Sequence, residues 1–164
     1  THTHTHTHPF FFFFLKKMYI AQDNPMSNWD FLLTPKLSQL RQLLLTGRNL
    51  STVTGDQFRF LGRLTNLQIK GTDWTELPDG LLLPLRDLER LTVHSNHITT
   101  FRNTWLDHPK LRDLNLYDNP MLTTIEPGAF DKCTSLQSLV MTENAALAQL
   151  PPNLFGVPLP VNLL

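Results

Sequence analysis

The chain has 164 residues, enough for one domain, and its 14 basic and 14 acidic side chains give a formal net charge of zero. This balance favours neither nucleic acid nor an anionic membrane as a partner, and no run approaches the roughly 20 apolar residues of a transmembrane helix. A single cysteine, Cys133, excludes a disulfide within the chain.

The chain opens with the low-complexity stretch THTHTHTHPFFFFFLKK. An (AC)n microsatellite in the DNA would encode the Thr-His repeat, and a pyrimidine tract would encode the run of phenylalanines. We therefore interpret the stretch as translated non-coding sequence. The alternative is a metal tract, because Thr-His alternation on an extended strand would place four imidazoles on one face, those of His2, His4, His6 and His8. We predict that residues 1–30 form a low-complexity or disordered segment, with residues 1 to about 27 outside the core and no metal site, and that residues 31–164 form the folded domain.

Five segments in the folded part repeat one pattern. They begin at Leu40, Leu64, Leu88, Leu111 and Leu136, with spacings of 24, 24, 23 and 25 residues, and apolar residues return at repeat positions 1, 4, 6, 11 and 14. Positions 4 and 6 are two apart, so on a short strand both side chains point to one face. A period in the twenties with this spacing is the signature of a leucine-rich repeat. We therefore predict an α/β solenoid of about five repeats, with short parallel strands on a concave face and a mostly irregular convex side.

Position 9 of the last three repeats is asparagine, at Asn96, Asn119 and Asn144. A side-chain amide there can donate to and accept from loop backbone that the stacked repeats bury. We predict that these residues form a structural Asn row. Arg48 and Thr72 take this position in the first two repeats. We expect fewer side-chain hydrogen bonds to hold the turns of these repeats.

A second row of apolar residues resembles the typical extracellular subfamily of leucine-rich repeats, with its stacked phenylalanines on the convex side. Its members lie near position 19 and again three residues later, where Pro109 and Cys133 replace leucine. The stretches NPMLTTIEPGAFDKCTSLQSL (119–139) and LPDGLL (77–82) are most similar to ectodomains of Toll-like receptors and related animal surface proteins. We interpret Cys133 as a small buried hydrophobe.

The outward positions of the strands are the candidate binding surface, because the resemblance implies ligand binding on the concave face. Tyr and Arg are frequent binding anchors, although the same face could simply be solvated. The predicted ligand-binding residues are Lys70, Arg90, Thr92, His94, Asp113, Asn115 and Tyr117. Lys70 and Arg90 lie toward the first repeats and Asp113, Asp118 and Glu143 toward the last, so a ligand with opposite polarity along its length should be steered. An aromatic anchor with charges of both signs suits a protein surface, so we expect a protein ligand, with no nucleic acid and no direct membrane contact by this segment.

The same surface does not predict an enzyme. His94 and Asp113 or Asp118 fall on adjacent strands, but Ser95 is beside His94 on one strand and Cys133 is on the back, so no nucleophile is expected to join them. An open sheet also excludes no water. We expect no catalytic residues and no cofactor.

The leading hypothesis is a fragment of an extracellular receptor or adhesion glycoprotein, Toll-like in character and of the kind that acts in innate immunity. Asn49-Leu50-Ser51 is an N-glycosylation sequon that agrees with it. One alternative is a cytoplasmic leucine-rich repeat scaffold, which would explain the free cysteine. Another is the substrate-recognition part of a larger enzyme, such as a receptor kinase or ubiquitin ligase.

Overall fold

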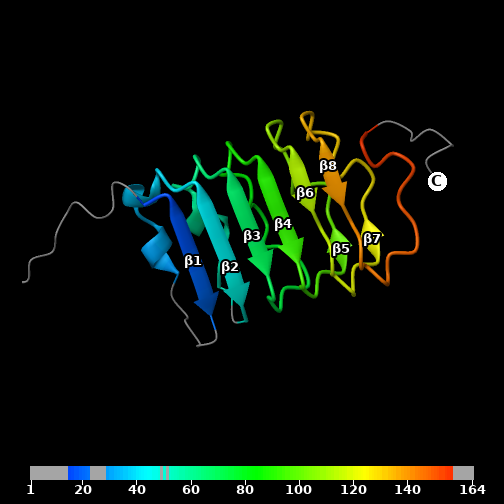
Figure 1. Cartoon of the computed structure of the whole chain (residues 1–164), viewed down its shortest axis with the longest axis horizontal. Coiled ribbons are helices and arrows are strands. Elements are labelled where there is room, and N and C mark those ends of the chain that lie inside the picture. Colours follow the sequence, from blue (N-terminus) through cyan, green and yellow to red (C-terminus); the bar gives the residue numbers. More distant parts are fainter. Residues whose placement is uncertain (1–14, 23–28, 49, 51, 157–164) are drawn as a thin grey trace, which may run out of the picture.

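The structure is a computed structural model that describes residues 15–22, 29–48, 50 and 52–156. Its main element is a parallel sheet of six strands in the order β1-β2-β3-β4-β6-β8 (Figure 1). The strands are β1 (Lys17–Gln22), β2 (Gln42–Gly47), β3 (Asn66–Lys70), β4 (Arg90–His94), β6 (Asp113–Asn115) and β8 (Ser138–Val140). They lie side by side in chain order, so each turn of the chain adds one strand to the sheet.

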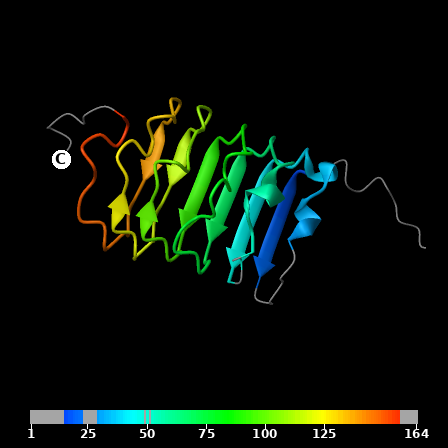
Figure 2. The ribbon, with the colours of Figure 1, turned by 180° about the vertical axis from the view of Figure 1, so that it is seen from behind.

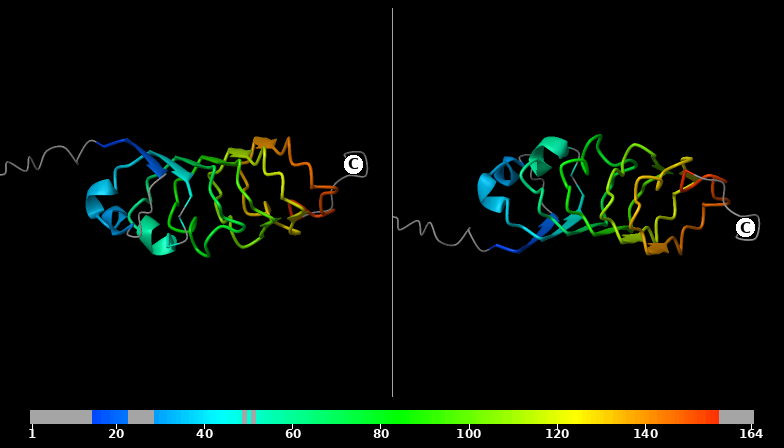
Figure 3. Two further views of the ribbon diagram at one scale, coloured as in Figure 1. Left: turned by 90° about the horizontal axis from the view of Figure 1, so that it is seen from below. Right: turned by 90° about the horizontal axis from the view of Figure 1, so that it is seen from above.

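The opposite side of the solenoid is made of turns, short 3-10 helices and a second, two-stranded sheet (Figures 2 and 3). These elements are η2 (Asp30–Leu32), η3 (Pro35–Leu37), η4 (Gly55–Phe58), β5 (Thr100–Phe101) and β7 (Thr124–Ile125). None of the described helices is long or apolar enough to cross a membrane. The prediction of parallel strands on one side and mostly irregular structure on the other is confirmed.

The core lies between these two layers and is built by the periodic leucines. Position 4 of one repeat stacks on position 4 of the next, as Leu43, Leu67 and Leu91 do in strictly aligned register. These three side chains are at most 2% exposed. In the fifth repeat, Leu139 at position 4 and Met141 at position 6 are only partly buried, since no described strand lies beyond β8. The predicted register of the five repeats is confirmed.

One expectation is wrong at the N-terminal end. Residues 17–22 were expected outside the core, but they form β1, which pairs with β2 along its length. Met18 aligns with Leu43 and Ile20 with Leu45, and both pack against the core. The sequence signal is Leu15-x-x-Met18-x-Ile20, which repeats positions 1, 4 and 6 at a distance of 40 − 15 = 25 residues before Leu40. The histidines at 2, 4, 6 and 8 lie outside the described residues.

The asparagines at position 9 form a hydrogen-bonded ladder through the interior. Asn119 Nδ2 donates to the carbonyls of Val93 and Leu116, both at 2.9 Å, and Asn119 Oδ1 accepts from the backbone N–H of Asn96 at 3.2 Å. Asn144 Oδ1 accepts in the same way from the N–H of Asn119, at 2.8 Å. Each amide therefore joins two neighbouring turns whose backbone groups are buried away from water.

Thr72 continues this ladder into the second repeat, in place of asparagine. Its backbone N–H and its hydroxyl both donate to Asn96 Oδ1, at 3.0 and 2.7 Å, and its side chain is 2% exposed. The hydroxyl also accepts from the N–H of Trp74 at 3.3 Å. The turn is thus tied by a different side chain. Arg48, which takes this position in the first repeat, is exposed.

Position 8, at or shortly after the end of each strand, has a left-handed backbone conformation. Glycine supplies it in the first two repeats, whereas the last three use side chains that pay a steric cost there. The φ angles are 107° at Gly47, 60° at Gly71, 54° at Ser95, 53° at Asp118 and 60° at Glu143. In the third repeat this turn brings the side chains at positions 7 and 8, His94 and Ser95, into hydrogen-bond contact at the C-terminal end of β4.

The back row departs from expectation in one place. His108, and not Pro109, is the buried residue of the row, with 2% of its surface exposed. Its carbonyl accepts from the N–H of Leu111, as the carbonyl of Leu85 accepts from Leu88. The third repeat is one residue shorter than its neighbours, which shifts the buried position by one. Cys133 is a buried free thiol, as predicted, and burial raises its pKa to about 11.

Candidate functional site: the exposed face of the sheet

The structure brings the seven predicted ligand-binding residues together on one side of the sheet, here called the strand face. They come from β3, β4, β6 and the turn after β6. Aligned pairs across neighbouring strands are Lys70 with His94, Arg90 with Asp113, and Thr92 with Asn115. We call this set the central strip.

Arg90 and Asp113, the first residues of β4 and β6, form an ion pair on the strand face. Arg90 Nε lies 3.0 Å from Asp113 Oδ2, and the two side chains are 62% and 46% exposed. An exposed pair of this kind adds little stability, at most about 1 kcal/mol. The remaining guanidinium N–H groups of Arg90 stay available to another acceptor.

His94, at the other end of β4, is the centre of a polar network. Its Nδ1 lies 3.0 Å from Ser95 Oγ, and its Nε2 lies 2.9 Å from Gln68 Nε2. Ser95 Oγ in turn donates to Asp118 Oδ2 at 2.6 Å. A neutral His94 that donates from Nδ1 and accepts at Nε2 satisfies every group in this chain.

Tyr117 covers the imidazole. The two rings are stacked with centroids 4.5 Å apart and an angle of 14° between their planes. His94 is consequently only 8% exposed, whereas the sequence predicted it among the outward contacts. His94 therefore acts mainly as a support that holds Tyr117 flat on the face.

The sequence argument that Ser95 cannot join His94 to an aspartate is wrong. The left-handed turn at Ser95 places its hydroxyl within hydrogen-bond distance of both His94 and Asp118. The order in which these side chains are hydrogen-bonded is nevertheless unsuited to catalysis. A base must hold the nucleophile on one nitrogen and the orienting carboxylate on the other. In this network the serine contacts the carboxylate directly, and Gln68 occupies the second nitrogen.

Burial is the main cause that lowers the pKa of His94, and the positive charge of Lys70 lowers it further, while Asp118 acts in the opposite direction. Burial likewise lowers the pKa of His108, against the hydrogen bond from its ring to the Leu82 carbonyl. Both rings are therefore kept neutral in the folded chain at pH values where they would be protonated in the unfolded chain.

We expect the free energy of unfolding to fall as the pH falls below about 6.5, the ordinary histidine value. Below that value the unfolded chain binds protons that folded His94 and His108 do not accept, so acid favours unfolding until the folded pKa is reached. Each histidine can contribute at most about 1.4 kcal/mol per pH unit. Urea titrations between pH 5 and 7.5 would measure the slope, and His108→Gln, whose amide can still donate to the Leu82 carbonyl, should reduce it.

The matched control for this slope is His97→Gln, because His97 is exposed. The wild-type slope should survive that change. A slope that His108→Gln and His94→Gln leave intact would show that other groups cause the acid sensitivity.

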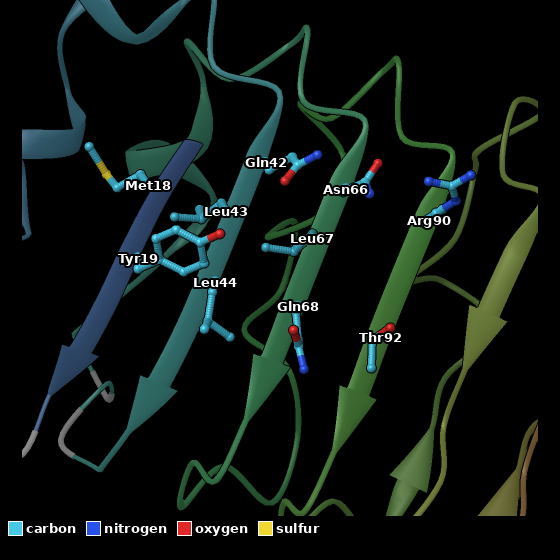
Figure 4. Close-up of a pocket in the computed structure, with 10 residues that line it drawn as sticks. All are labelled: Met18, Tyr19, Gln42, Leu43, Leu44, Asn66, Leu67, Gln68, Arg90 and Thr92. Carbon is cyan, nitrogen blue, oxygen red and sulfur yellow. The ribbon is translucent and has the colours of Figure 1, made fainter. Parts of the chain in front are cut away.

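A shallow hollow lies on the strand face next to the central strip, over β1 to β4 (Figure 4). It has a volume of about 210 Å³. Tyr19 and Leu44 form its exposed apolar end. The polar side chains that line it are Gln42, Asn66, Gln68, Arg90 and Thr92, and Met18, Leu43 and Leu67 complete the lining. The sequence prediction missed Tyr19 because residues 1–30 were assigned outside the domain; the 25-residue echo of the repeat pattern would have found it.

One predicted feature cannot be placed. The glycosylation candidate Asn49 lies outside the described residues. Within the described part of the chain, no three His, Cys, Asp or Glu side chains are grouped so that they could hold a metal ion.

Comparison with known proteins identifies the repeat. Residues 86–145 match the family model described as leucine rich repeat. No curated protein sequence matches the chain.

Two solved structures are similar in fold. One, described as the TLR13-ssRNA13 complex, has 18% sequence identity and a TM-score of 0.47, with 83% of this chain and 27% of that chain covered. The other is the Toll–Spatzle complex of Drosophila, at 17% identity and a TM-score of 0.46, with 87% of this chain and 25% of that chain covered. The chain thus spans about a quarter of the length of these two matched chains.

Proposed function

We propose that this chain, a leucine-rich repeat protein whose family model match lies at residues 86–145, is a module that binds a protein ligand on the strand face. The observation that carries the proposal is the central strip. An exposed Arg90–Asp113 pair and the Tyr117 ring lie on the same face of the sheet, and the ring is stacked on His94. Such a combination of an aromatic anchor and charges of both signs suits a protein surface.

Binding agrees with the chemistry of the face better than catalysis does. The face is open, so it cannot exclude water from a reaction, and the His94 network has the wrong order for a nucleophile and its base. All its members are instead paired with one another, which makes them rigid. A pre-organised surface loses less conformational entropy when a partner binds.

An extracellular receptor or adhesion ectodomain is the setting we propose for this module, supported by the resemblance of its back row to extracellular repeats. The buried Phe58 and Phe130 belong to that row. A cytoplasmic scaffold or the substrate-recognition part of an enzyme would use the same face in the same way. The function proposed for the strand face is thus independent of the compartment.

Charge on the strand face sorts by position and should steer a ligand. The cations Lys70 and Arg90 come from β3 and β4, and the acids Asp113, Asp118 and Glu143 from the last two repeats. A partner with opposite polarity along its surface would approach in one orientation.

The test uses an array of purified secreted and cell-surface proteins probed with the full chain. For each hit, Arg90→Ala and Tyr117→Ala should lower affinity at least about five-fold each, the loss expected of binding anchors. Arg90→Ala should barely change the unfolding midpoint, since its ion pair is exposed. Tyr117→Ala should cost about 1 kcal/mol of stability because it removes the ring stack.

Two exposed cations on the opposite side are the matched controls. Arg59 lies over the ring of Phe60, and Lys132 lies 4.0 Å from Asp107. Arg59→Ala and Lys132→Ala should leave binding unchanged. If hits survive both central-strip variants and are lost with the two controls, the ligand binds the convex side and the proposal fails.

A further inference from the structure

The hollow at the N-terminal end of the strand face has an exposed apolar anchor. Tyr19 of β1 is 69% exposed, and it is aligned with Leu44 of β2, whose side chain lies beside it (Figure 4). Aromatic and aliphatic side chains exposed together on a sheet cost solvation free energy unless a partner covers them. A single large apolar side chain would fill the space between this pair and the floor of the hollow.

Side-chain amides form the floor beside that anchor. Gln42 and Asn66 are aligned neighbours on β2 and β3, and neither side-chain amide has a hydrogen-bond partner among the described residues. Gln68 uses its amino group toward His94, which leaves its oxygen free to accept. An amide side chain both donates and accepts, and it can therefore pair with the N–H and C=O groups of a peptide backbone.

The dimensions fit an extended segment that crosses the strands. Neighbouring strands of a sheet are about 4.8 Å apart, and an extended chain rises about 3.3 Å per residue. The path from β1 to β4 is three strand spacings, about 14 Å, which four or five residues would span. The depression is too shallow and open to enclose a small molecule.

Charge decides which peptide is favoured. Positions 3, 5 and 7 of the first four strands include Lys17, Lys70 and Arg90 but no aspartate or glutamate. Arg90 pairs with Asp113 through Nε, so its other N–H groups can take a second carboxylate. Only one cation lines the hollow itself, too few to follow the closely spaced phosphates of a nucleic acid strand.

We propose that the hollow over β1 to β4 binds an extended segment of the protein ligand, with a large apolar side chain on Tyr19 and Leu44 and a carboxylate at Arg90. The inference rests on the proposed function of the strand face and adds a defined subsite and a ligand chemistry to it. The peptide backbone between the two anchors pairs with Gln42, Asn66 and Gln68.

The test selects phage-displayed random seven-residue peptides on the full chain and measures synthetic copies of the winners by fluorescence polarisation. Enriched peptides should share one large apolar residue and one acidic residue three to four positions away. Leu44→Gln and Tyr19→Ala should each weaken binding at least about five-fold. Arg90→Ala should weaken acidic peptides but leave unchanged a copy whose acid is replaced by its amide.

Circular dichroism checks that Leu44→Gln and Tyr19→Ala fold, and Arg59→Ala is the control that should bind as the wild type does. The inference falls if no peptide is enriched, or if the enriched peptides bind both hollow variants unchanged. It also falls if no peptide binds but a fluorescent oligouridine does, and if Leu44→Gln and Tyr19→Ala abolish that oligouridine binding.

The outcomes also separate this inference from the proposed function. Array hits that depend on Tyr117 but not on Tyr19 or Leu44 would retain the strand face as the binding surface and remove the hollow. Array hits and peptides that respond to neither set of variants would overturn both.

Discussion

Leu116→Asp should leave the chain largely unfolded, whereas Asn115→Asp, one residue earlier, should change the free energy of unfolding by less than about 0.5 kcal/mol. Leu116 is 1% exposed inside the stack, and its carbonyl accepts from the amides of Asn119 and Asn144. Truncation to alanine alone should cost about 2–5 kcal/mol. A buried carboxylate with no cation adds several kcal/mol to this, and the sum is comparable to the whole stability of a typical domain, about 5–15 kcal/mol.

Asn115 is the matched control because it points to the strand face. Its Oδ1 accepts from the N–H of Tyr117 at 3.1 Å, and an aspartate oxygen can accept the same bond. Urea denaturation followed by circular dichroism measures both variants, with Leu116→Ala as the variant that stays folded. Equal losses at the two positions would mean that the strand is one residue out of register.

Much of this solenoid could be predicted from the sequence because its leucines carry the information. The alternation of Leu114 and Leu116 with Asn115 fixes which side of the strand faces the core, and the spacing of repeats fixes which residues are neighbours across strands. The pairing of Arg90 with Asp113 follows from that register alone, as does the position of the Asn row.

The sequence-based prediction missed β1, although the sequence contains the signal for it. Met18 and Ile20 are as apolar as leucine and fill the same core positions, but the flanking Lys16 and Lys17 and the preceding repeats obscured them. Edge strands tolerate such charges, because lysine at an edge discourages pairing with other chains.

Local geometry explains the other differences between the sequence-based predictions and the structure. The contact of Ser95 with His94 depends on a left-handed φ of 54° at a non-glycine residue, which no pattern of apolar residues encodes. The burial of His108 in place of Pro109 depends on how the short third repeat absorbs its missing residue. The low exposure of His94 depends on the ring of Tyr117, placed there by the next turn of the chain.

Asn119→Ala should cost about 2–5 kcal/mol, although it removes no apolar surface. Its amide joins two neighbouring turns: Nδ2 donates to the carbonyls of Val93 and Leu116, and Oδ1 accepts from the N–H of Asn96. Asn119 is 2% exposed, so water cannot readily replace these bonds. Each buried backbone group left without a partner costs about 1–3 kcal/mol, and the Leu116 carbonyl alone keeps a second donor, Asn144.

The same substitution at Asn66 is the control, since that amide lies on the strand face and should cost less than about 0.5 kcal/mol. Both variants replace asparagine with alanine and so share the change in intrinsic backbone propensity. The difference between their urea midpoints therefore measures what the hydrogen-bonded ladder contributes to stability. Asn119 also fixes the turn that carries Tyr117, because its Nδ2 lies 3.3 Å from the Tyr117 carbonyl. Asn119→Ala should therefore loosen the ring over His94 and change the near-ultraviolet circular dichroism. Equal stability of the two alanine variants would show that the leucine stack, without the ladder, holds these turns in place.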